Sequence, residues 1–180
     1  MGDAELLKSF REGDNTQKAF EAIVREYGER LYWHIRKMVI SHEDANDVLQ
    51  NCLVKAWRGL PSFREESKLY TWLYRIATNE VITFLKKRRT SLFQPLSEVS
   101  RQLSNTLEAD PLFQGDTIQL ELQKAILKLP NRQRQVFNMR YFDELPYEEI
   151  SQILGASVGA LKASYHHAAG KVEEYMKQSV

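Results

Sequence analysis

The sequence has little that would support disulfide, membrane or polyanion-coating chemistry. Its one cysteine, Cys52, cannot form a disulfide within the chain, so nothing requires an oxidising compartment. Apolar runs such as 39–40 and 81–82 are far shorter than the roughly 18–20 residues that cross a bilayer, and the N-terminus lacks the pattern of a signal peptide. Lysine plus arginine (25) nearly balance aspartate plus glutamate (24), which argues against a uniformly basic surface. We expect a soluble, cytoplasmic protein with no membrane insertion.

What the sequence does have is helical periodicity. Apolar residues recur every three or four positions in several long segments, with Ser41 and Ser67 placed to cap two of them. No segment alternates polar and apolar residues over a sustained stretch, so we expect no sheet. The N-terminal segments with this helical pattern are 19–39, 45–57 and 69–85.

Residues 90–115 interrupt the pattern. They contain Pro95, Pro111 and Gly115, are rich in serine and threonine, and carry more acidic than basic residues. Such a composition is typical of a linker. The sequence therefore predicts an all-α fold, in which two small helical domains at 1–89 and 116–180 are joined by a flexible linker at 90–115.

The C-terminal segment has the pattern of a helix-turn-helix. A short amphipathic helix at 147–154 is followed by Gly155, by Ser157 as a capping residue, and by a second helix from Val158 to about Met176. A tight glycine-containing turn between two such helices is typical of proteins that place the second helix in the major groove of DNA. An ordinary αα-hairpin in a bundle is the alternative.

The N-terminal half carries aromatic residues between basic ones. Stacking rings and nearby cations are what single-stranded nucleic acid requires. Trp72, Ile76 and Phe84 share the apolar stripe and are assigned to the core, whereas Tyr70, Tyr74 and Asn79 are better placed for contact. The interleaved residues are Phe63, Arg64, Lys68, Tyr70, Trp72, Tyr74, Arg75, Phe84 and the basic run Lys86, Lys87, Arg88 and Arg89.

Catalytic chemistry has no clear candidates in this sequence. Cys52 lies in an apolar stripe and is assigned to the core. The adjacent His166 and His167 diverge on a helix and cannot jointly hold a metal, and His34 and His42 have no partners at ligand spacing. We expect no catalytic residues, no metal site and no cofactor, and we do not expect an enzyme.

Two groups of motifs in series resemble a known family. DANDVLQ (44–50), KAW (55–57) and WLYRIATN (72–79) resemble region two of bacterial RNA polymerase sigma factors, and in particular of their extracytoplasmic-function (ECF) group. LPNRQRQVF (129–137), YEEI (147–150) and SVG (157–159) resemble region four of the same group. The resemblance covers both predicted domains in their order.

The resemblance implies a transcription initiation factor that binds core RNA polymerase, directs it to promoter DNA and promotes promoter melting. Some members of the family also bind an anti-sigma factor. The residues implied to contact the polymerase core are Asp44, Asp47, Gln50 and Asn51. Those implied to bind the minus-ten DNA are Arg64, Lys68, Tyr70, Arg75, Asn79, Lys86, Lys87, Arg88 and Arg89. Those implied to bind the minus-thirty-five DNA are Ser157, Ala160, Lys162, Ala163, His166 and His167.

Two other kinds of protein share part of this pattern. One is a regulator that binds DNA through its helix-turn-helix alone, with an N-terminal half that only dimerises or senses. The other is a helical enzyme, for which the sequence offers no site. A simple regulator has no reason to carry both Asp47–Gln50 and Trp72–Asn79, which favours the sigma-factor interpretation.

Overall fold

The computed structural model describes residues 2–13, 15–91, 96–111 and 116–179, with side chains throughout these ranges except at 90, 91 and 96–100. Within these ranges the longer elements are all α-helices and no strand occurs, which confirms the predicted all-α class. The helices are α1 (Asp3–Glu12), α2 (Thr16–Val39), α3 (His42–Gly59), the 3₁₀ turn η1 (Leu60–Ser62), α4 (Leu69–Ser91), α5 (Leu96–Glu108), α6 (Thr117–Leu127), α7 (Asn131–Tyr141), α8 (Tyr147–Leu154) and α9 (Val158–Ser179).

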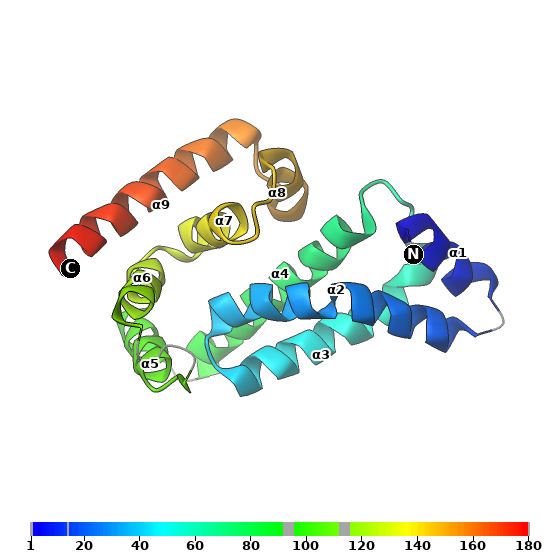
Figure 1. Cartoon of the computed structure of the whole chain (residues 1–180), viewed down its shortest axis with the longest axis horizontal. Helices are drawn as coiled ribbons and strands as arrows, with labels where there is room; N and C mark the ends of the chain where they lie inside the picture. The colour runs from blue at the N-terminus through cyan, green and yellow to red at the C-terminus, as the bar shows by residue number, and fades with distance from the viewer. Residues whose placement is uncertain (1, 14, 92–95, 112–115, 180) are drawn as a thin grey trace.

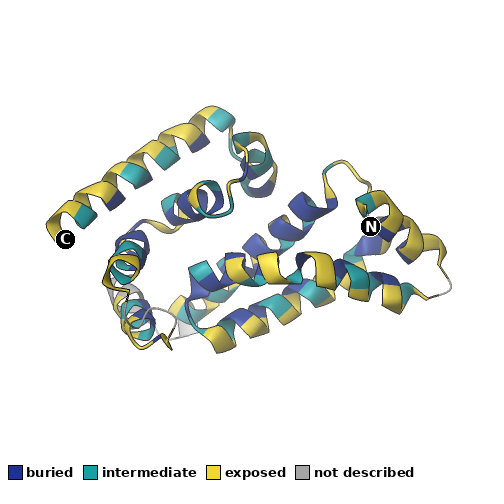
Figure 2. Cartoon of the chain, in the orientation of Figure 1, coloured by how far each residue is buried: buried dark blue, intermediate teal, exposed yellow. Residues whose placement is uncertain are grey.

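The N-terminal half is a bundle of α2, α3 and α4, with α1 packed against α2 (Figure 1). Polar side chains cap two of these helices. Asn15 accepts a hydrogen bond from the Lys18 amide at 2.9 Å at the start of α2, and Ser41 accepts one from the Asp44 amide at 3.4 Å at the start of α3. Each helix turns its apolar stripe inward, so buried residues alternate with exposed ones along the bundle (Figure 2).

In the C-terminal half, α9 lies along α6 and α7. Its inner face buries Ala168 and Val172 against Ile126 of α6 and Phe137 of α7. The opposite face of α9 is exposed (Figure 2). Since α9 is covered on one side only, a long strip of this helix remains open to a partner.

The turn between α8 and α9 has the geometry that the sequence predicts. Gly155 adopts φ +68°, a left-handed conformation that a side chain resists, and its amide donates to the Ser151 carbonyl at 2.8 Å. Ser157 then accepts a hydrogen bond from the Ala160 amide at 3.2 Å and caps α9. The predicted helix at 147–154 and the predicted start at Val158 are both confirmed.

The range predicted as a linker, 90–115, contains the helix α5. Leu103 and Leu107, four residues apart, are buried against Ile40 at the end of α2 and Leu127 at the end of α6. The sequence prediction missed this helix because the surrounding serines and prolines obscure a short apolar stripe. The connector is therefore anchored to both halves through α5.

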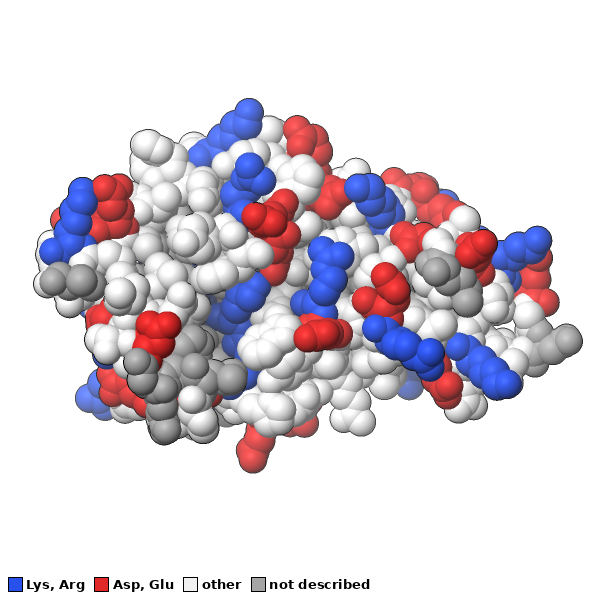
Figure 3. Space-filling view, in the orientation of Figure 1, with Lys and Arg blue, Asp and Glu red and all other residues white. Residues whose placement is uncertain are grey.

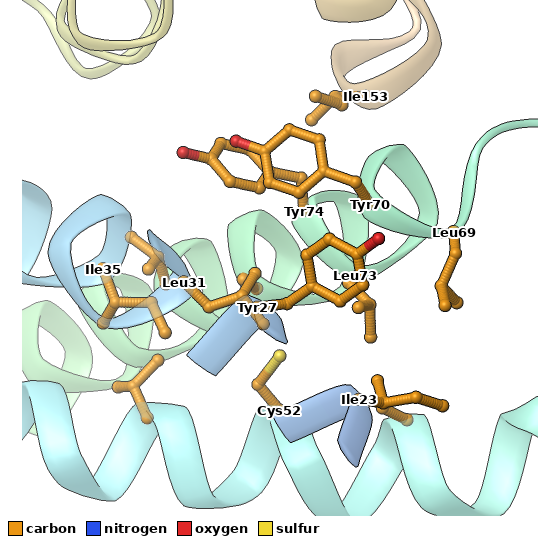
Figure 4. Packing of buried hydrophobic residues seen from close by; sticks show 14 of the residues in the cluster. Ile23, Tyr27, Leu31, Ile35, Cys52, Leu69, Tyr70, Leu73, Tyr74 and Ile153 are labelled. Carbon is orange, nitrogen blue, oxygen red and sulfur yellow. The ribbon is translucent and has the colours of Figure 1, made fainter. Parts of the chain in front are cut away.

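The two halves pack directly on each other. Helix α8 lies on α4 and α7 lies on α2, and Val136, Met139 and Ile153 belong to the same hydrophobic cluster as the core of the N-terminal bundle. Figure 4 shows Ile153 above the rings of Tyr70 and Tyr74. The predicted halves thus share one continuous apolar core in this arrangement.

Burial of Ile35 predicts a measurable loss of stability. Ile35 of α2 has 0% exposure, so Ile35→Ala is expected to lower the free energy of unfolding by about 2–5 kcal/mol, because it removes buried methyl groups and leaves a cavity. Urea denaturation followed by circular dichroism measures the change. Ile118→Ala is the matched control, since Ile118 is 62% exposed and its loss is expected to change stability by no more than about 0.5 kcal/mol. Equal losses in both variants would contradict the assigned core.

Burial also predicts that Cys52 is inert. The side chain has 0% exposure. Burial, and to a lesser extent the nearby Glu80 carboxylate, raises the pKa of the thiol to about 12. At mildly alkaline pH the thiol stays protonated and out of reach of reagents. We expect no reaction with an aromatic disulfide reagent until urea unfolds the chain. A Cys52→Ser, Ser179→Cys variant, which carries an exposed thiol instead, should react at once; fast labelling of the native parent chain would contradict this placement.

Candidate functional site

The start of α9 forms the most accessible of the predicted surfaces. All six residues predicted for the minus-thirty-five contact are exposed: Ser157, Ala160, Lys162, Ala163, His166 and His167. Lys162 lies with its Nζ 5.8 Å from the centroid of the Tyr147 ring on α8, a distance at which a cation and a ring face still attract each other. The positive end of the helix dipole is at this end of α9. This surface combines small side chains, one lysine and the amino end of a helix.

A second exposed surface lies on α3. Asp47, Gln50 and Asn51 are exposed, as predicted for a polymerase contact, whereas Asp44 is half-buried. The Asp44 carboxylate accepts a hydrogen bond from Arg88 Nη1 at 3.0 Å. That ion pair ties the start of α3 to the end of α4, so Asp44 is placed more to join two helices than to face solvent.

Next to these polar residues lies an apolar groove that sequence reasoning missed. The groove has a volume of about 750 Å³ and lies between α2 and α3, with Phe20, Leu49 and Gln50 among its lining residues. Val54 and Trp57 also line it and are 43% and 41% exposed. Trp57 ends the apolar stripe of the segment 45–57, whose helical spacing predicts α3. The signal that could have found the groove is the width of that stripe, which extends further round α3 than one neighbouring helix can cover.

Most of the residues predicted for the minus-ten contact lie on the exposed side of α4 and of the loop before it. Arg64, Arg75 and Asn79 are exposed, and so are Lys86, Lys87 and Arg89 in the basic run. Arg88 is half-buried by its pairing with Asp44. Trp72 and Phe84 are partly buried against the core, which agrees with their assignment to the apolar stripe.

The placement of Tyr70 and Tyr74 corrects the prediction that they are available for contact. Both side chains are buried, with 8% and 1% exposure. The Tyr70 ring lies 4.6 Å from the Tyr74 ring and 4.0 Å from the Arg30 guanidinium, and Ile153 of α8 lies above both rings (Figure 4). Burial raises the pKa of Tyr70 to about 12. The prediction was wrong because helical periodicity describes one helix at a time and cannot show that α8 covers this face.

Charged groups reinforce the same contact between the halves. Lys68 Nζ lies 2.6 Å from Glu149 Oε1 of α8, so this predicted minus-ten residue is exposed but paired. Lys37 Nζ lies 2.6 Å from Asp143 Oδ1, and His34 Nδ1 lies 3.4 Å from Asp143 Oδ2. Burial by itself would raise the pKa of the Asp143 carboxyl, but His34 and Lys37 bring it below its ordinary value. Asp143 is therefore held as a carboxylate between α2 and the α7–α8 loop.

Charges of both signs are interspersed on the face shown in Figure 3. Basic groups follow α4 and the start of α9 without forming one large field. Among the described residues, no group of three or more histidine, cysteine, aspartate or glutamate side chains is arranged to hold a metal ion. No helix in the described ranges is both long and apolar enough to span a membrane.

Comparison with family models matches both halves of the chain. The model described as Sigma-70 region 2 matches residues 23–90, and the model described as Sigma-70, region 4 matches residues 119–172. The first match covers α3 and nearly all of α4, and the second covers α8, the turn after it and the larger part of α9. They stand in the order in which the motifs occur in the sequence.

Similar proteins of known identity span nearly the whole chain. The chain is 31% identical over 179 residues to the ECF RNA polymerase sigma factor SigW of Bacillus subtilis, covering 95% of each protein. It is 31% identical over 185 residues to the ECF RNA polymerase sigma-E factor of Escherichia coli K12, covering 96% of this chain and 93% of that protein.

Two solved structures share the fold. CnrH in complex with the cytosolic domain of CnrY superposes with a TM-score of 0.71 at 22% identity over 99% of both chains. The sigma factor RpoE in complex with the anti-sigma factor NepR from Bartonella quintana gives 0.70 at 23% identity over 89% of this chain and 98% of that one. Since both family regions and relatives of full length agree, the chain belongs to the ECF group of sigma-70 RNA polymerase sigma factors.

Proposed function

We propose that this chain binds core RNA polymerase, directs it to specific promoters and promotes promoter melting at initiation. In this proposal residues 1–89 bind the polymerase and the minus-ten DNA, residues 90–115 connect the halves, and residues 116–180 bind the minus-thirty-five DNA. The observation that carries it is that this chain, a member of the family, has both an exposed helix α9 and an exposed polar face on α3.

The start of α9 is suited to reading duplex DNA. Ala160 and Ala163 are exposed, and alanine side chains can contact thymine methyl groups in the major groove. Lys162, between them in sequence, can reach a base edge or a phosphate. The turn at Gly155 sets the angle of α9 to α8, which is how a helix-turn-helix presents its second helix. Sequence readout of the duplex is assigned to this surface.

The exposed side of α4 is suited to holding separated strands. Arg64, Arg75 and Asn79 are exposed there, and the basic run at 86–89 continues along the same helix. Cations neutralise phosphates without reading sequence, whereas an amide such as that of Asn79 hydrogen-bonds to an unpaired base. Capture of the unpaired strand favours melting because the opened state gains contacts that the duplex lacks.

The α3 surface is suited to docking on a large protein. Asp47, Gln50 and Asn51 provide exposed polar groups, and the adjacent groove at Val54 and Trp57 provides apolar area. An apolar centre with a polar rim is the usual composition of a stable protein interface. We assign this composite surface to core RNA polymerase.

The remaining roles follow from the same assignment. Catalysis belongs to the polymerase, so the chain itself acts as an initiation factor and not as an enzyme, and it works in the cytoplasm, where the polymerase is. The related RpoE is solved with the anti-sigma factor NepR, and CnrH with the cytosolic domain of CnrY. We propose that a protein inhibitor of this kind also binds this chain.

Transcription in vitro tests the function. Purified core polymerase is supplied with a pool of promoter fragments, with and without this chain, and transcript ends are mapped. We expect discrete start sites that appear only when the chain is added. Binding of duplex DNA by the chain without any association with polymerase would overturn the proposal and would indicate a helix-turn-helix regulator instead.

Reversing one charge on α3 tests the polymerase contact. Asp47→Lys is expected to weaken core binding about tenfold or more, equivalent to about 1.4 kcal/mol, because Asp47 is exposed on the proposed interface. Fluorescence anisotropy of the labelled chain measures this affinity. Glu26→Lys makes the same charge change at an exposed site on α2 and should bind core as the parent does. Circular dichroism should be unchanged in both variants; unaltered core affinity of Asp47→Lys would refute the placement.

Truncating one lysine on α9 tests the duplex contact. Lys162→Ala is expected to cost about 1–3 kcal/mol of promoter binding, with relaxed preference at one base pair if the lysine reaches a base edge. Holoenzyme binding to a promoter set with single substitutions in the minus-thirty-five element measures both. Lys171→Ala is the control, since Lys171 is exposed further along α9 and hydrogen-bonds to Gln133 at 3.0 Å. Identical effects of the two substitutions would contradict the assigned contact.

A further inference from the structure

A cavity of about 320 Å³ lies where α4, α5 and α7 meet, away from the surfaces assigned above to the polymerase and to the duplex. Its apolar wall combines Leu85 from the end of α4, Leu103 from α5, and Leu127 and Leu129 from the end of α6 and the residues after it. The volume is at the lower end of the roughly 300–1,000 Å³ that ligand pockets occupy. The cavity is therefore large enough for a small ligand and apolar enough to hold a hydrocarbon group.

Among the described residues that line this cavity, those that carry a charge are all basic. Lys86, Arg89, Arg132 and Arg134 contribute to the lining, and no described lining residue is acidic. Arg89 and Arg132 are exposed, and Arg132 Nη2 also donates a hydrogen bond to the Leu154 carbonyl at 3.1 Å, whereas Arg134 is 2% exposed. A cavity of this composition attracts an anion on one side and an apolar group on the other.

Arg134 is the unusual member of this set. Its guanidinium forms a weak hydrogen bond to Asn131 Oδ1 at 3.4 Å, its Nε has no hydrogen-bond partner, and no carboxylate of the described residues forms an ion pair with it. Burial lowers the pKa of this group to about 10, which leaves it charged at neutral pH. A buried charge without a counter-ion is costly, and an anion that enters the cavity removes that cost.

The amino end of α7 adds to the same positive environment. Its N-cap is Pro130, which has no side-chain cap for the first amides of the helix. Pro130, Asn131 and Arg132 all line the cavity. Uncapped amides and the helix dipole together favour an anion at this position.

We propose that this cavity binds a small anionic amphiphile, whose carboxylate or phosphate head pairs with Arg134 at the amino end of α7 and whose hydrocarbon body lies along Leu85, Leu103 and Leu129. Arg89 and Arg132 contact the solvent-facing side of the head group. This inference goes beyond the proposed function and does not rest on it, because it is tested by ligand binding to the isolated chain. The cavity does share Lys86 and Arg89 with the basic run that is assigned above to the separated strands.

Binding at this cavity has a structural consequence. Leu85 and Arg89 belong to α4 in the N-terminal half, whereas Arg134 belongs to α7 in the C-terminal half. A ligand that contacts both walls binds only when the halves are packed together, so it stabilises that arrangement by mass action. The amphiphile therefore acts as an effector that favours the packed form.

Calorimetric titration of the full chain with decanoate tests the inference, with decyl phosphate, decanol and inorganic phosphate as comparison probes below their aggregation concentrations. We expect saturable binding of decanoate or decyl phosphate to one site per chain and at least about tenfold weaker binding of decanol and of inorganic phosphate. Saturating decanoate is also expected to raise the melting temperature. If decanol bound as tightly as decanoate, the proposed anion site would be refuted. If inorganic phosphate bound as tightly as decanoate, the proposed contact between the hydrocarbon body and the leucines would be refuted.

Three variants separate ligand binding from folding. Arg134→Met is expected to melt no lower than the parent chain without ligand, because it removes a buried charge that forms no ion pair with the described residues, and it is expected to lose decanoate binding. Arg134→Lys should keep part of that binding. The double variant Arg89→Gln, Arg132→Gln changes two exposed side chains and is expected to weaken binding about fivefold or more. Arg25→Met, at an exposed site on α2, is the control and should bind normally. Undiminished binding by the double variant or by Arg134→Met would overturn the proposal.

Discussion

The packing of α8 on α4 is the contact on which the rest of this arrangement depends. Ile153 covers the rings of Tyr70 and Tyr74 (Figure 4), and the Lys68–Glu149 and Lys37–Asp143 ion pairs flank it. Through this contact the apolar residues of both halves form one cluster. Loss of the contact would expose aromatic surface on one side and the inner residues of α7 and α8 on the other, so the position of α9 relative to α4 is set here.

The helices that join the halves also carry buried polar atoms without partners. Thr71 Oγ1 of α4 and Asn138 Oδ1 of α7 are buried without a hydrogen bond, and α4 packs on α8 while α7 packs on α2. An unsatisfied buried polar atom costs about 1–3 kcal/mol. The apolar burial that joins the halves is thus partly offset, which makes separation easier than it would be for a core of the same area with all its polar atoms paired.

Local features of the fold could be predicted from the sequence, and relations between distant segments could not. The helices around Ile35, Cys52 and Leu73 follow from apolar spacing, and the turn at Gly155 follows from the demand for a positive φ, because these depend on neighbouring residues only. The burial of Tyr70 depends on α8, some 80 residues away, and no periodicity within α4 reports it. The same limit applies to the groove at Trp57, because the exposure of Trp57 depends on which helices lie beside α3, and the spacing within α3 does not report that. Asp47 and Lys162 were placed correctly on exposed faces because their own helices determine that.

The covered position of Tyr70 constrains any ligand that needs the face of its ring. A base cannot stack on that ring while Ile153 occupies the space, so α8 must first move away from α4. The observed affinity for such a ligand equals its intrinsic affinity multiplied by the fraction of molecules already separated. Any partner that holds the two halves apart raises that fraction and strengthens binding of the ligand without touching the ring. Docking of such a partner on α3 or α9 therefore changes the affinity for a ligand at Tyr70 of α4.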